Sequence, residues 1–374
     1  MPSFPNELFT LAFLILTVAF VLWFTKRFRE NPVVKHLPAP LLCYFLPMIA
    51  SSAGIIPNDL SLYPALSRHL LPVCLILLLA GAHLSKIWQL GPAALISMAA
   101  GTFAIILGGP LLFILYKPWL PDNSWMGLGA LSASWTGGSA NMIAVKESVG
   151  TPESLFSVMV IVDSIVCYLW MGIVMQISSF QQEYDRWNRS RMEWLDEIEA
   201  PDVMIKKGAV PKGTVPFFIF ICLLSGFLVS FFVKSSTVAV LLATAIGIGF
   251  SFLKKGSNPL FETLGYFLLY LLLTSIGARA NLAGIFQTPV YLLFGFSWVI
   301  LMGLTLLVVG RIFRIPLFFL ATASQANVGG TASATIVAAV YQPHLAFVGL
   351  LLAILGNVFG TYLGIGCAYL MRLL

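Results

Sequence analysis

The chain has 374 residues, of which 59% are hydrophobic and only 10% charged, and its mean hydropathy is +0.93. Soluble domains carry about 25% charged residues, so this composition excludes a water-soluble protein and predicts an integral membrane protein. The net charge of +6 predicts basic loops on the cytoplasmic side of a membrane and no nucleic-acid partner. The five cysteines lie in apolar runs without a CxxC pair, which predicts buried side chains and no metal site.

Long apolar runs without period-2 alternation predict helices, because only helices and closed barrels satisfy their backbone in lipid. The first run, 7–24, is followed by three basic residues, which predicts a retained span with an external N-terminus. Further spans are predicted at 39–56, 64–85, 91–116, 123–149, 151–178, 215–233, 237–253, 259–279, 286–311, 316–340 and 344–372. The polar segment 179–213 between the halves predicts a cytoplasmic linker with a solvated helix.

Three stretches of the first half recur in the same order in the second half, which predicts an internal repeat. The pairs are 75–96 with 268–293, "WTGGSAN" (135–141) with "NVGGTAS" (327–333), and 150–172 with 341–364. We therefore expect a first repeat at 1–178, the linker at 179–213 and a second repeat at 214–374. Basic loops favour inverted repeats, whereas six candidate spans between equivalent helices preserve orientation. Either one candidate is not a simple span or one span is missed, so we expect about 11–13 transmembrane helices.

Each repeat contains an apolar segment that is interrupted by paired glycines, at about 123–149 and 316–340. Interrupted helices in corresponding positions of two halves indicate the binding site of a transporter. The alternative is that the glycines only allow close helix packing. The candidate substrate- or ion-binding residues at the breaks are Thr136, Gly137, Gly138, Ser139 and Asn141, with Gln325, Asn327, Gly329, Gly330, Thr331 and Ser333. Their neutral oxygens suit sodium or a polar substrate, although some hydroxyls are expected to bond their own helix.

Asp163 lies in "VMVIVDSIVCYLW", within a predicted span. A carboxylate is unfavourable there and should have a partner or a function. It either binds a coupling cation or proton, or is a structural partner of Lys146. Asn357 in "AILGNVFG" occupies the corresponding region of the second repeat. A sodium ion at Asp163, Asn141 and Asn327 is one expected ligand; no other cofactor is expected.

Other charged residues have two interpretations each. Lys146 and Glu147 either end their helix at the membrane surface, or Lys146 reaches back to Asp163. Arg279 either anchors a helix end or attracts an anionic substrate, and His83 at the equivalent position is expected to pack or lie at the interface. The sequence contains none of the common catalytic motifs, so we do not expect an enzyme.

Several of these stretches carry a family resemblance. The segment 135–172, "DRWN" (185–188), "GARANL" (277–282) and "NVGGTASATIVAAVY" (327–341) resemble the domain-of-unknown-function 819 family over essentially the whole chain. That family resembles the superfamily of cation:proton antiporters and anion transporters, which includes sodium–proton antiporters and bile-acid:sodium symporters. The resemblance implies two inverted repeats, a scaffold or panel domain, and a core domain with two crossing broken helices.

The resemblance also implies elevator-like alternating access, in which the core moves against the scaffold. It maps the broken helices onto 123–149 and 316–340 and the ion-binding acid onto Asp163. Antiporters that exchange two protons carry paired acids there, whereas this chain has Val162 and Ser164 beside Asp163. That departure argues against electrogenic sodium–proton exchange.

The combined hypothesis is an all-α polytopic membrane protein that acts as a sodium- or proton-coupled secondary transporter of a small organic solute, an anion being one option. The alternatives are a cation–proton antiporter and, in another class, a channel or a non-transporting membrane scaffold. Expected partners are the lipid bilayer, a small-molecule or ion substrate and a second copy in a homodimer. The expected location is a bacterial plasma (inner) membrane.

Overall fold

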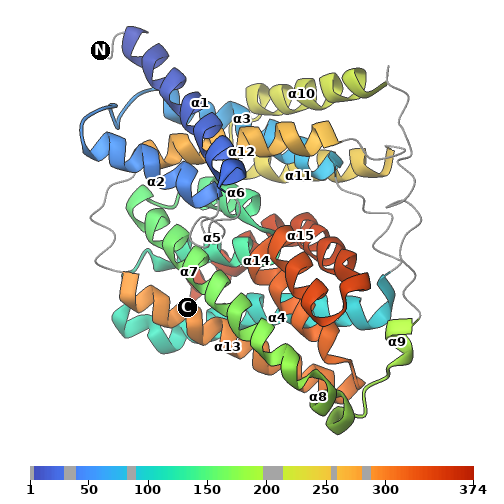
Figure 1. The fold of residues 1–374 in the computed structure, drawn as a ribbon. Coiled ribbons are helices and arrows are strands. Elements are labelled where there is room, and N and C mark those ends of the chain that lie inside the picture. The colour runs from blue at the N-terminus through green and yellow to red at the C-terminus, as the bar shows by residue number, and fades with distance from the viewer. Residues whose placement is uncertain (1–3, 29–38, 82–89, 197–213, 254–258, 280–287) are drawn as a thin grey trace.

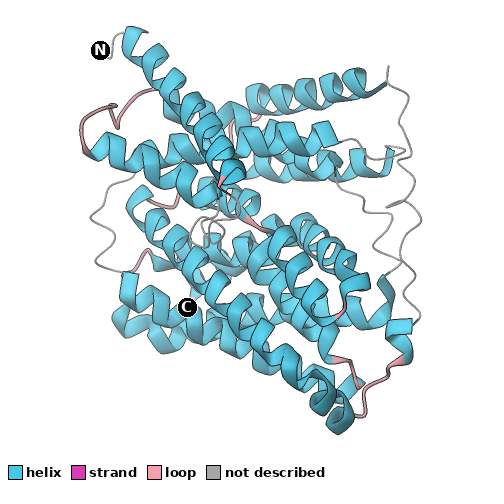
Figure 2. Cartoon of the chain, in the orientation of Figure 1, coloured by secondary structure: helices cyan, strands magenta, loops and turns pink. Residues whose placement is uncertain are grey.

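A computed structural model describes residues 4–28, 39–81, 90–196, 214–253, 259–279 and 288–374. Every regular element among these residues is a helix, as Figure 2 shows. Eight helices of the described chain are long and apolar enough to cross a membrane. These findings confirm the predicted all-α polytopic membrane fold.

Each half of the chain contributes a series of helices. The first half contains α1 (Phe4–Arg27), α2 (Ala39–Ser52), α3 (Leu62–Gly81), α4 (Gly91–Tyr116), α5 (Ser124–Gly137), α6 (Ser139–Val149) and α7 (Glu153–Ile177), then α8 (Gln181–Asn188) and α9 (Glu193–Asp196). The second half contains α10 (Thr214–Phe232), α11 (Ser236–Leu253), α12 (Pro259–Arg279), α13 (Thr288–Phe313), α14 (Leu317–Tyr341) and α15 (Ala346–Leu373). Short 3-10 helices lie at Lys117–Trp119, Ser178–Phe180 and Pro343–Leu345.

The long helices form two groups that do not follow the halves of the sequence (Figure 1). One group, here called the panel group, contains α1, α2, α3, α10, α11 and α12. The other, the core group, contains α4 to α7 and α13 to α15. Packing is extensive within each group, whereas the groups meet mainly where α11 contacts α6 and α15. Each half of the chain therefore supplies helices to both groups.

The equivalent helices α3 and α12 lie antiparallel in the panel group. The hydroxyl of Ser275 near the end of α12 donates to the carbonyl of Tyr63 at the start of α3, at 3.5 Å. Further along α3, the Cys74 thiol donates to the carbonyl of Gly265 near the start of α12, at 3.4 Å. The contacting residues thus run in opposite directions along the two helices, as inverted repeats require.

The equivalent helices α4 and α13 are antiparallel in the core group as well. The rings of Tyr116 at the end of α4 and Phe294 near the start of α13 are 5.2 Å apart. At the other end, a β-carbon at Gly101 would lie 3.8 Å from the side chain of Leu306. Both helix pairs therefore agree with the predicted inverted arrangement.

Two glycines change the chain direction in the core group. Gly138 separates α5 from α6 with φ +78° and ψ −178°, and Gly330 interrupts α14 with φ +74° and ψ −165°. L side chains rarely adopt such positive φ values, whereas glycine does so freely. The second glycine of each predicted pair is thus the residue at which the helix breaks.

The first broken segment folds back as a helix hairpin, and both of its arms lie along α15. A β-carbon at Gly364 would lie 2.5 Å from Ala133 of α5 and 3.1 Å from Val145 of α6. The hydroxyl of Thr151, just after α6, donates to the carbonyl of Met126 near the start of α5. The two ends of the segment are therefore neighbours.

The second broken segment, α14, folds back in the same way along α7. Trp170 of α7 donates its ring N–H to the Ser324 hydroxyl in the first arm at 3.2 Å. Tyr341, at the end of the second arm, donates to the carbonyl of Val174 at 2.7 Å. Leu320 and Tyr341, from opposite arms, line one groove.

The two hairpins resolve the conflict over orientation. A hairpin that enters and leaves on the same side does not cross the membrane. If a hairpin is not counted as a crossing, one of the six spans between equivalent helices is removed. The remaining number is odd, and an odd number of spans inverts the second repeat. The predicted broken helices are present, but each reverses direction at its break.

Candidate functional site

The tip of the first hairpin packs on the last helix of the opposite repeat. The Asn141 amide donates to the carbonyl of Gly137 at 2.6 Å and to that of Asn357 at 3.2 Å. Its Oδ1 accepts a hydrogen bond from Thr361. A β-carbon at Gly138 would lie 3.5 Å from Asn357 Oδ1. Asn141, Gly138 and Asn357 are thus brought together, as a shared site requires.

The tip of the second hairpin packs on α7, the last long helix of the first repeat. The Gln325 amide lies 3.7 Å from Cys167 Sγ, to which it donates. A β-carbon at Gly329 would lie 3.1 Å from the same sulfur and would overlap the side chains of Gln325 and Ser333. Each hairpin tip therefore packs on the last long helix of the opposite repeat.

Asp163 lies on α7 one helical turn before Cys167 and faces α5, near the tip of the first hairpin. Ser134 and Trp135 of α5 approach its carboxyl group. Asp163 Oδ1, Trp135 Nε1 and Gln325 Oε1 are all buried and have no hydrogen-bond partner among the described residues. Asp163, Ser134, Trp135, Cys167 and Gln325 are here called the polar centre.

The unpartnered atoms of the polar centre leave hydrogen-bonding capacity unused. A buried polar atom without a partner costs about 1–3 kcal/mol, and native proteins contain few of them. Here an acceptor of a carboxyl, an acceptor of an amide and an indole donor share one cluster. The carboxyl and amide oxygens suit a cation or a proton, whereas the indole N–H is directed at the Asp163 carboxyl group. Trp135 and Cys167 lie in stretches quoted for the repeat, but no sequence signal marked them as site residues.

Asn327 lies outside the polar centre. Its amide donates to the carbonyl of Ala323 at 3.0 Å and to Met98 Sδ at 3.3 Å, and its Oδ1 accepts from Thr102 at 2.9 Å. Among the described residues, no hydrogen bond links Asn141 or Asn327 to Asp163. The structure therefore does not assemble the three residues expected to hold sodium into one cluster.

The hydroxyls at the breaks divide into two kinds. Thr136 donates to the carbonyl of Ser132 at 2.9 Å, and Ser333 donates to that of Gly330 at 3.4 Å. Both bonds stay within their own segment, as the structural interpretation of these hydroxyls predicted.

Ser139 and Thr331 open the second arms of the hairpins and are half-buried. The Tyr266 hydroxyl of α12 approaches the side chain of Thr331. A residue of the panel group therefore reaches the tip of a core-group hairpin.

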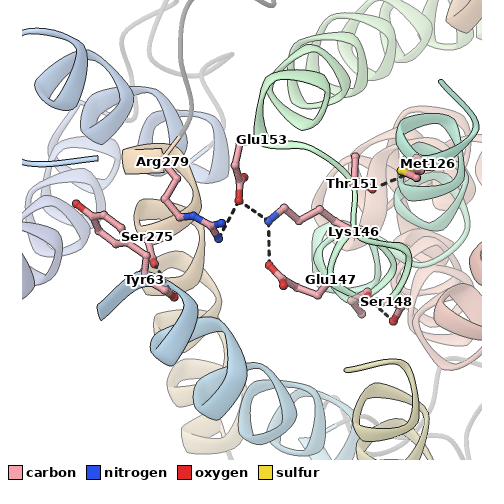
Figure 3. Close-up of polar contacts among 10 residues, drawn as sticks. Tyr63, Met126, Lys146, Glu147, Ser148, Thr151, Glu153, Ser275 and Arg279 are labelled. Carbon is pink, nitrogen blue, oxygen red and sulfur yellow. Dashed lines mark hydrogen bonds and ion pairs between the residues drawn. The ribbon is translucent and has the colours of Figure 1, made fainter. Parts of the chain in front are cut away.

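A chain of ion pairs joins the two helix groups (Figure 3). Lys146, at the end of α6, is only 3% exposed, and its Nζ lies 2.9 Å from Glu147 Oε1 and 2.8 Å from Glu153 Oε1. Arg279, at the end of α12, places Nη1 2.9 Å from the same Glu153 oxygen. We call these four residues the interface network, because Glu153 links a core-group lysine to a panel-group arginine.

The interface network gives Lys146 different partners from the expected one. Among the described residues, no ion pair joins Lys146 to Asp163. Arg279, interpreted as an anchor or a substrate-attracting cation, has a carboxylate partner, and His83 lies outside the described residues. Sequence reasoning missed Glu153; its place at the first turn of α7, after Pro152, was the available signal.

The "DRWN" motif forms the connection that starts the second hairpin. Asp185 Oδ1 accepts the backbone N–H of Leu317, the first residue of α14, at 2.9 Å. The Asn188 amide donates to the carbonyls of Gly310 and Ile315 at 3.2 and 3.1 Å. A carboxylate at a helix N-terminus satisfies a free donor and complements the helix dipole. The motif therefore fixes where α14 begins.

Comparisons with known proteins agree with this architecture. A family model described as "Protein of unknown function (DUF819)" matches residues 12–374. The chain is also 28% identical over 348 residues to the "Uncharacterized membrane protein YjcL" of Bacillus subtilis (strain 168), covering 85% of this chain and 86% of that protein. With its apolar helices and this membrane-protein relative, the chain belongs to the DUF819 family of integral membrane proteins.

Proposed function

We propose that this protein is a secondary active transporter in which the polar centre binds the coupling ion, sodium or a proton. The observation that carries the proposal is the pairing of each hairpin tip with the last helix of the opposite repeat, next to an unpartnered Asp163 oxygen. Intramembrane carboxylates and paired helix breaks are both typical of ion and substrate pathways. A solute cavity between the two tips would place cargo beside the ion.

An elevator-like movement of the core group against the panel group accounts for the sparse packing between the groups. The cargo that fits best is a small organic solute with an anionic group. The second arms of both hairpins begin at the tips, and the N-terminal ends of helices attract anions. This account also explains why the tips carry amides and hydroxyls rather than apolar side chains.

A cation–proton antiporter is the second candidate, because Asp163 alone is enough for competition between a cation and a proton. A channel or a non-transporting scaffold would belong to a different class. Neither of these explains why two groups of helices pack so sparsely against each other. Uphill movement of a solute separates the transporter from a channel.

The proposal is tested by ion-dependent stability of the purified full chain. Asp163→Asn should abolish the response of the apparent melting temperature to sodium, or reduce its response to pH, because the variant lacks the group that binds either ion. At 100 times the dissociation constant, a bound ion stabilises by about 2.7 kcal/mol. Asp122→Asn, at an exposed aspartate, should respond as the wild type does. Equal responses of the wild type and Asp163→Asn to both ions would refute the role of Asp163.

A further inference from the structure

An apolar groove runs along the outer face of the core group, between α7, α13 and α14. Its volume is about 340 Å³, and nearly all its lining atoms are apolar. Its lining residues include Trp170, Ile173, Ile300, Gly303, Leu304 and Leu307. A β-carbon at Gly303 would lie 2.7 Å from the Trp170 ring, so the glycine keeps the depression open.

The groove faces the surroundings of the protein. Ile173 is 46% exposed and Leu304 is 56% exposed. In an integral membrane protein, outward apolar side chains on long helices face lipid. The groove is therefore accessible to lipid chains.

One end of the groove is basic. Tyr184 and Phe180 line that end, and the Tyr184 ring lies 6.0 Å from the ring of Trp187. The Arg311 guanidinium stacks over Trp187 at 4.6 Å and donates to its carbonyl at 3.1 Å. A guanidinium has five donors, and that of Arg311 is exposed. Donors thus remain for an anion at the end of the groove.

More arginines surround this end than acids. The exposed arginines of α8 and the following turns are Arg186, Arg189, Arg191 and Arg314. Of the nearby acids, Glu183 and Glu193 are exposed, whereas Asp185 is buried and accepts the Leu317 N–H. Exposed Trp187 and Phe180 are the aromatic residues expected at headgroup depth. Clustered arginines beside a transmembrane helix attract anionic lipids.

We propose that this groove binds one acyl chain of an anionic phospholipid whose phosphate lies at Arg311. The groove takes the chain through apolar contact, and the guanidinium takes a phosphate oxygen through charge-assisted hydrogen bonds. A zwitterionic lipid has the same chain but a weaker net attraction to the arginine cluster. The site is separate from the polar centre and does not depend on the transport proposal.

The test uses the purified full chain in detergent and phospholipids with brominated chains, which quench nearby tryptophans. Brominated phosphatidylglycerol should quench fluorescence saturably, and brominated phosphatidylcholine should do so only at higher concentration. Trp170→Phe should lose part of the saturable quenching, because Trp170 lies in the groove. Trp298→Phe, at a tryptophan fully buried against α4, should retain it.

Charge variants test the headgroup contact. Arg311→Gln should weaken apparent affinity for phosphatidylglycerol about five-fold, as expected for one basic residue at a membrane surface. The matched control Arg27→Gln changes another exposed helix-end arginine beside an aromatic ring and should leave affinity unchanged. Unaltered quenching in Trp170→Phe, equal binding of both lipids, or equal effects of the two arginine variants would overturn the proposal. Cross-linked dimers that abolish quenching would overturn it too, since a second copy would then cover the groove.

Discussion

The two glycines of each pair have different tasks. Gly138 and Gly330 supply the positive φ that turns each hairpin. Gly137 and Gly329 have helical φ, but a β-carbon on either would overlap neighbouring side chains. Gly138 and Gly330 therefore break the helices as predicted, whereas Gly137 and Gly329 allow close packing.

Gly329→Ala should destabilise the protein, since the new methyl group would overlap Gln325 and Ser333. Such overpacking costs about 1–3 kcal/mol, which lowers the apparent melting temperature of the purified protein. Gly172→Ala is the matched control, because a β-carbon at this exposed helical glycine meets no described atom within 4 Å. It should leave the melting temperature unchanged or raise it slightly. Equal melting temperatures of the two variants would contradict the tight packing of Gly329.

Single residues could be predicted from the sequence where the signal was local. A carboxylate within an apolar run identified Asp163, and repeated glycine pairs identified the breaks. The partners of Asp163 could not be predicted. Trp135 reaches it from the first hairpin, and Gln325 of the second hairpin contacts Cys167 one helical turn away, so this proximity depends on how the two repeats interlock.

At the scale of elements, each arm of the first broken segment is too short to cross a membrane alone. α5 has 14 residues and α6 has 11, which gives about 21 and 16 Å at 1.5 Å per residue. Neither arm crosses a hydrocarbon core of about 30 Å. The breaks were predictable, but the direction after each break depends on packing against α15 or α7.

Asp185→Asn should loosen the start of α14, because a charge-assisted bond to the Leu317 N–H becomes a neutral one. Loss of such a helix-terminal contact costs about 0.5–2 kcal/mol. Hydrogen exchange measured by mass spectrometry should accelerate in the first arm of α14. Glu183→Gln, at an exposed acid on the same short helix, should leave that exchange unchanged. Identical exchange in the two variants would show that the cap does not hold α14.

At the scale of the whole molecule, the protein consists of two helix groups joined by a thin interface. Inverted repeats were predictable from basic loops and internal similarity. The division into groups follows neither half of the chain, so it was expected only from the family resemblance. No sequence signal paired Glu153 with Arg279, because the two residues are 126 positions apart in the chain, with several helices between them.

Arg279→Gln should make the spacing between the groups more variable, because the variant loses the ion pair with Glu153 across the interface. Spin labels at exposed Lys117 and Ser235, one in each group, report this spacing by pulsed electron resonance. The native cysteines are buried, so labels attach preferentially at the introduced positions. Arg372→Gln, within the core group, should leave the distance distribution unchanged. A distribution in Arg279→Gln as narrow as that of the wild type would contradict the bridging role.

The most direct measurement is solute accumulation in proteoliposomes under an imposed sodium or proton gradient. Small organic anions are supplied as a mixture, and vesicle contents are read by mass spectrometry. The account predicts that wild-type protein and Asp122→Asn concentrate at least one solute above its external level only when the gradient is present, and that Asp163→Asn does not. Equilibration without accumulation, or accumulation by Asp163→Asn equal to that of the wild type, would contradict it.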